Sequence, residues 1–187
     1  MSQNIIQPYR FGGGAGCFES WSYQNSVNSQ MASWCSTRDM YGICLVAGSE
    51  LIGKVITSVE YKVKKNGTGT TCSSDLTGRI VADTTHGSTV ETAIATSTNT
   101  IDATTLSDDD VITFSFSGVS ALVEGNGICC HATNTSSCMD CWTNYFTLKM
   151  RDPQTADQYV FRTIEWGGGS WEWRDTDNNL FIKVCYE

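Results

Sequence analysis

Short runs in which apolar and polar residues alternate constrain the fold of this chain more than any other feature. Between positions 59 and 64, Val59, Tyr61 and Val63 alternate with charged residues. This alternation is typical of a strand with one buried and one wet face. Other strand-like runs, rich in β-branched residues, occur at 77–83, 90–97, 111–117, 159–164 and 180–186. No window has a convincing 3.6-residue period, so the pattern predicts an all-β, antiparallel β-sandwich that is jelly-roll-like.

The chain has 187 residues, a length that favours one domain. Residues 1–40 are rich in Gly, Ser, Asn and Gln and show no dominant period, so we expect an irregular N-terminal arm. Strand patterns then fill residues 41–187 without a linker, and we expect one β-sandwich domain there. The segments 127–132 and 143–150 look like the two arms of a β-hairpin.

Charge and hydropathy exclude several classes of function. The net charge is −8 with only 12 Lys and Arg residues, so a phosphate backbone is a poor partner and we expect no nucleic acid. No apolar run reaches the roughly 18 residues of a membrane span. Recognised catalytic motifs are also missing, among them the Gly-x-Ser-x-Gly elbow and the phosphate-binding loop. We therefore expect a protein that is not an enzyme.

Nine cysteines are many for this length and indicate an oxidising destination. Residues 1–8 have neither a basic leader nor an apolar stretch, so we see no secretory signal peptide. A virion component released by lysis would reconcile the two observations, and a cytosolic protein with reduced thiols is the alternative. An odd count leaves at least one thiol free or paired between chains. Cys185 is expected to pair with a cysteine of the arm and staple it to the body.

The densest cluster of candidate ligands is Cys129-Cys130-His131 followed by Cys138 and Cys141. A hairpin with its turn near 135–136 would place Cys130 opposite Cys141, which predicts a cross-strand disulfide. Two alternatives stay open. Cys129, His131, Cys138 and Cys141 could hold zinc, or the thiols could be free.

Two further groups near the C-terminal end suggest ligands. Trp171 and Trp173 share one face of a predicted strand, and exposed aromatic rings could stack on sugars. Alternatively, they cover the open end of the core or a subunit contact. Asp175 and Asp177 offer alternating oxygen ligands for calcium, or they belong to a solvated turn.

Several short motifs carry a resemblance to a known family. They are ITSV at 56–59, KNGTG at 65–69, LTGRI at 76–80, AIATS at 93–97, GGSW at 168–171 and NLFIKV at 179–184. The chain resembles the choice-of-anchor β-sandwich domains, which look like jelly-roll carbohydrate-binding modules. Such modules occur on exported surface proteins and on phage or virus particles. The resemblance implies a jelly-roll fold and no common catalytic site.

These observations lead to one expected function and two rivals. We expect a structural subunit or decoration protein on a virus-like particle or other extracellular assembly. Its partners would be copies of itself or other particle subunits, without membrane insertion. The first rival is a carbohydrate-binding module that recognises glycan through Trp171 and Trp173. The second is a hydrolase with an unrecognised pair of carboxylates.

Overall fold

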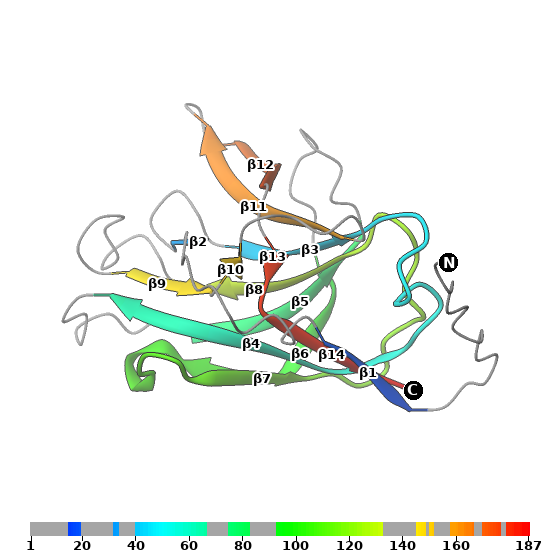
Figure 1. Cartoon of the computed structure of the whole chain (residues 1–187), viewed down its shortest axis with the longest axis horizontal. Helices are drawn as coiled ribbons and strands as arrows, with labels where there is room; N and C mark the ends of the chain where they lie inside the picture. Colours follow the sequence, from blue (N-terminus) through cyan, green and yellow to red (C-terminus); the bar gives the residue numbers. More distant parts are fainter. Residues whose placement is uncertain are drawn as a thin grey trace, which may run out of the picture.

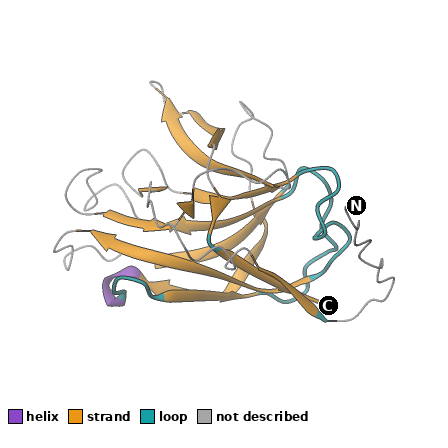
Figure 2. Cartoon of the chain, in the orientation of Figure 1, coloured by secondary structure: helices purple, strands orange, loops and turns teal. Residues whose placement is uncertain are grey.

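A computed structural model describes ten ranges of the chain. They are residues 15–19, 32–33, 40–66, 75–82, 93–132, 145–148, 150–151, 158–166, 170–176 and 179–187. Within these ranges the regular structure is β, apart from one 3₁₀ turn, η1 (Ala103–Thr105) (Figure 2). All of the strand pairs between them are antiparallel. The predicted all-β class and antiparallel β-sandwich are confirmed.

Two six-stranded sheets make up most of this structure (Figure 1). The first runs in the order β1 (Gly16–Glu19), β14 (Ile182–Tyr186), β4 (Ile56–Asn66), β9 (Tyr145–Leu148) and β2 (Ala32–Ser33), with β7 (Val111–Ser115) also paired to β4. The second runs in the order β12 (Ser170–Thr176), β11 (Gln158–Trp166), β3 (Met40–Leu45), β8 (Gly127–Ala132), β5 (Asp75–Val81) and β6 (Ala93–Asp102). The short strands β10 (Met150–Arg151) and β13 (Asn179–Leu180) form a separate pair.

The core lies between the two sheets. Val59, Tyr61 and Val63 on β4 are buried, as their alternation predicts, whereas Glu60 and Lys62 keep contact with solvent. The same apolar cluster draws on both sheets, with Phe114, Leu148 and Val184 from the first and Ile43, Ile80 and Ile128 from the second. Burial of alternate side chains from two facing sheets is what stabilises a β-sandwich.

A glycine sets how closely the sheets approach at one point of the core. A β-carbon built on Gly78 of β5 would lie 2.7 Å from Cβ and 2.8 Å from Cγ of Phe114 on β7. A side chain at position 78 would therefore push the facing strand away. The missing side chain lets Phe114 of the first sheet sit directly over the backbone of the second.

One side of the sandwich is closed by an asparagine side chain. On β6, Asn99 Nδ2 donates to the carbonyl of Thr113, at 2.9 Å, and its Oδ1 accepts from the N–H of Ser115, at 2.8 Å. Thr98 Oγ1 donates to the carbonyl of Ser115. These bonds satisfy backbone groups of β7 on the flank away from β4, much as another strand would.

The hairpin predicted from 127–132 and 143–150 is wrong. Strand β8 lies between β3 and β5 in the second sheet, whereas β9 pairs with β4 and β2 in the first. The six residues of β8 are all buried, so side chains on both faces of this strand are covered. Two consecutive strand patterns do not reveal whether they pair with each other or cross to opposite sheets, and here they cross.

Candidate functional site

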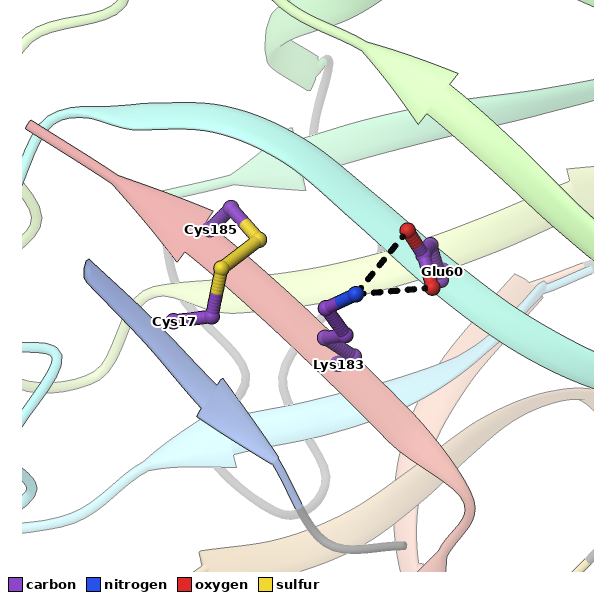
Figure 3. A network of polar contacts seen from close by, with 4 residues as sticks. All are labelled: Cys17, Glu60, Lys183 and Cys185. Atoms are coloured by element: carbon purple, nitrogen blue, oxygen red, sulfur yellow. Dashed lines mark hydrogen bonds and ion pairs between the residues drawn. A yellow bond between two sulfur atoms is a disulfide. The ribbon is translucent and has the colours of Figure 1, made fainter. Parts of the chain in front are cut away.

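A disulfide fixes part of the N-terminal arm to the last strand. Cys17 on β1 lies directly opposite Cys185 on β14, and their sulfur atoms are bonded, with 4.0 Å between the two Cα atoms (Figure 3). Two residues before Cys185, Lys183 bridges to Glu60 on β4, with 3.4 Å between Nζ and each carboxylate oxygen. The expectation that Cys185 pairs with a cysteine of the arm is confirmed.

Cys130 faces the core and carries a free thiol. It lies opposite Tyr41 on β3 and Gly78 on β5, and it has no exposed surface. Burial raises the pKa of this thiol, and the neighbouring Cys129 raises it further, so Cys130 stays protonated at neutral pH. Its predicted partner, Cys141, lies outside the described residues. Because β8 and β9 form no hairpin, their pairing does not support the predicted Cys130–Cys141 disulfide.

Cys129 and His131 share the opposite face of β8, turned away from the core. Their registers place Cys129 beside Gly42 and Arg79, and His131 beside Met40 and Thr77. The structure thus brings two of the four predicted zinc ligands to one face. The other two, Cys138 and Cys141, lie outside the described residues. Within the described ranges, no three His, Cys, Asp or Glu side chains gather closely enough to hold a metal ion.

This outer face of the second sheet carries a small sulfur-rich cluster. It consists of Met40, Val81 and Cys129, with Cys44 and Ala93 packed against it. The Sγ atom of Cys129 lies 3.9 Å from the Sδ atom of Met40 and 3.5 Å from the carbonyl oxygen of Arg79. Met40 was not among the predicted ligands, because only the register of β3 against β8 brings it next to them.

His131 extends this cluster along β8. His131 is 8% exposed, and its Nδ1 atom lies 3.5 Å from Oγ1 of Thr77. This contact with a buried hydroxyl fixes the orientation of the imidazole. The outer face of β3, β5 and β8 therefore offers a thiol, a thioether and an imidazole side by side.

The tryptophan and aspartate candidates lie on or after β12, at the end of the second sheet. Trp171 is in register with Glu165 of β11, and Trp173 with Thr163. Asp175 is the partner of Phe161 in the same ladder, so this residue belongs to a strand and not to a turn. The side chains of these three residues, and all of Asp177, lie outside the described part of the structure. Glycan and calcium binding stay predictions.

A second buried polar group lies inside the core. The hydroxyl of Tyr61 on β4 has no hydrogen-bond partner among the described residues. Burial raises the pKa of this phenol well above its ordinary value, and the nearby thiols of Cys129 and Cys130 raise it further.

Comparisons with known proteins add no relative. No helix in the described ranges is long and apolar enough to cross a membrane. No protein-family model matches the chain, and neither the curated proteins nor the solved structures give a match.

Proposed function

We propose that this protein is a non-enzymatic structural subunit or decoration protein on the surface of a virus-like particle or other extracellular assembly. The disulfide between Cys17 and Cys185 is the observation that carries the proposal. Stable disulfides belong to oxidising surroundings such as virion and cell surfaces. This one joins the first and last strands of the described fold, where chains otherwise fray and are attacked by proteases.

The charge of the chain supports the same reading. A net charge of −8 keeps densely packed copies soluble and disfavours nucleic acid as a partner. On the edge strand β6 the exposed positions include Thr96, Thr98 and Thr100, beside one exposed apolar residue, Ile94. Assembly contacts would then come from the arm and from the aromatic residues of β12.

The test is the mass of the full chain in its native state, with the disulfide intact. We expect native mass spectrometry and light scattering to show a multimer whose population grows with protein concentration. The variant Cys17→Ser, which lacks the disulfide, should form a smaller fraction of multimer at the same protein concentration. A monomer at every concentration, unchanged between the two proteins, would overturn the proposal.

A second candidate is a carbohydrate-binding module. It is favoured by the placement of Trp171 and Trp173 two residues apart on the terminal strand of a sheet, because stacking platforms for sugars need adjacent aromatic rings. A glycan array followed by calorimetry tests it. Binding should be lost in Trp171→Ala and Trp173→Ala but kept in Trp166→Ala on the neighbouring strand. An array without any bound glycan rejects this function.

A further inference from the structure

We propose that the outer face of the second sheet holds a site for a soft monovalent metal ion, Cu(I), with Cys129, Met40 and His131 as its ligands. The three residues come from two adjacent strands. Met40 on β3 lies directly opposite His131 on β8, and Cys129 precedes His131 by two residues, so all three side chains lie on one face. They are 3%, 0% and 8% exposed for Met40, Cys129 and His131.

The spacing of the two sulfur atoms suits one shared ion. Metal–sulfur bonds are about 2.3 Å long, and two such bonds at a trigonal angle hold their sulfur atoms about 4 Å apart. The Sγ atom of Cys129 and the Sδ atom of Met40 are 3.9 Å apart. An ion between them would need no rearrangement of the two strands, and His131, directly opposite Met40 in the register, is the proposed third ligand.

The donor set selects the metal. Thiolate and thioether ligands are soft and favour Cu(I), whereas structural zinc sites take four cysteine, histidine or carboxylate ligands. Binding releases the thiol proton of Cys129 to solvent, and the copper stays in the +1 state. The thiolate and the ion then sum to zero charge, which suits a buried position.

Two residues of β5 lie beside the proposed ligands. Arg79 of β5 lies opposite Cys129 in the register, and its buried Nε atom has no hydrogen-bond partner among the described residues. That N–H is an unused hydrogen-bond donor on the same face of the sheet as Cys129. The contact between Nδ1 of His131 and Thr77 orients the ring, as outer partners of metal-bound histidines do.

A glycine on the neighbouring strand leaves room for the side chain of Cys129. Gly42 lies opposite Cys129 on β3, and a β-carbon at position 42 would come within 2.6 Å of the β-carbon of Cys129. Any side chain there would displace the cysteine from Met40. The cluster of donors is thus built around a position that only glycine can occupy without moving Cys129.

The experiment titrates the full, disulfide-intact chain with Cu(I) under anaerobic conditions, without thiol reductant and against a chromophoric Cu(I) chelator. We expect one equivalent to bind, with an X-ray absorption spectrum that shows two sulfur neighbours and one nitrogen neighbour. Cys129→Ser should weaken binding about 10–100-fold. Met40→Leu, which conserves volume and so preserves the fold, should weaken it about tenfold.

Cys130→Ser is the matched control, because Cys130 is adjacent in sequence but faces the core; it should bind like the unaltered protein. If Cys129→Ser fails to fold, Met40→Leu alone decides the question. Copper binding that survives both substitutions would place the ion at other cysteines and overturn the proposal. So would the absence of binding, or binding of Zn(II) in preference to Cu(I).

Discussion

At the scale of single residues, Tyr61 combines a well-packed aromatic ring with a buried hydroxyl group. Its ring has no exposed surface and meets Phe114 edge to face, with 6.2 Å between ring centroids. Its hydroxyl, however, has no hydrogen-bond partner in the described part of the chain, and an unsatisfied buried polar group costs about 1–3 kcal/mol. Tyr61→Phe should therefore leave the free energy of unfolding unchanged or raise it by about 1 kcal/mol. Urea titration at pH 7 measures this difference, and Tyr61→Leu, which also removes the ring, should be destabilising.

Tyr61 and Cys130 make the free energy of unfolding depend on pH. Folding raises the pKa of Tyr61 above the 10.0 of an ordinary tyrosine and that of Cys130 above 9.0. In both groups the neutral form is the one that favours the folded state. The stabilisation of the folded state by these neutral groups is therefore complete below about pH 9. It is lost as the pH rises above 9.0 for Cys130 and above 10.0 for Tyr61. Between pH 10 and 11 the free energy of unfolding should fall less for Tyr61→Phe than for the unaltered protein. An equal fall in the two proteins would contradict this prediction.

At the scale of elements, Asn99 holds β6 against β7. Asn99→Ala removes two bonds to the backbone of β7, those to the carbonyl of Thr113 and the N–H of Ser115. We expect a loss of about 1–2 kcal/mol in the free energy of unfolding and faster hydrogen exchange at the amide of Ser115. Thr100→Ala, an exposed neighbour on the same strand, is the control and should change neither. Unaltered exchange in Asn99→Ala would show that other groups protect β7.

The elements also show how far the sequence alone determines this fold. The alternation around Tyr61 predicts β4 and its buried face, because burial of one face imposes a period of two. The pairing of β8 was not predictable in this way, since its residues are buried on both faces and such a run carries no register. For the same reason the cluster of Met40 with Cys129 was missed, as the two residues meet only through a pairing of strands far apart in sequence. The sequence predicted a disulfide between Cys185 and a cysteine of the N-terminal arm, but it did not identify Cys17 as that cysteine.

At the scale of the whole molecule, one covalent bond links the beginning and the end of the described fold. Cys17 and Cys185 are separated by 168 positions, so the disulfide closes nearly the full chain into one loop. In the chain-entropy model, closing a loop of this length restricts the unfolded state by about 5 kcal/mol. Without this bond, β1 is held to β14 by four residue pairs and by the partly buried ring of Phe18.

Breaking this bond should therefore lower the free energy of unfolding more than Asn99→Ala does. We expect Cys17→Ser and Cys185→Ser each to lower the free energy of unfolding by about 3–5 kcal/mol, measured by urea titration without reductant. The double variant serves as control: because each single substitution already breaks the bond, it should lose no more than either one. Hydrogen exchange of β1 should rise in all three, since an edge strand of four residues has little other support. If the single variants match the unaltered protein in urea, strand pairing holds the arm and the disulfide adds nothing.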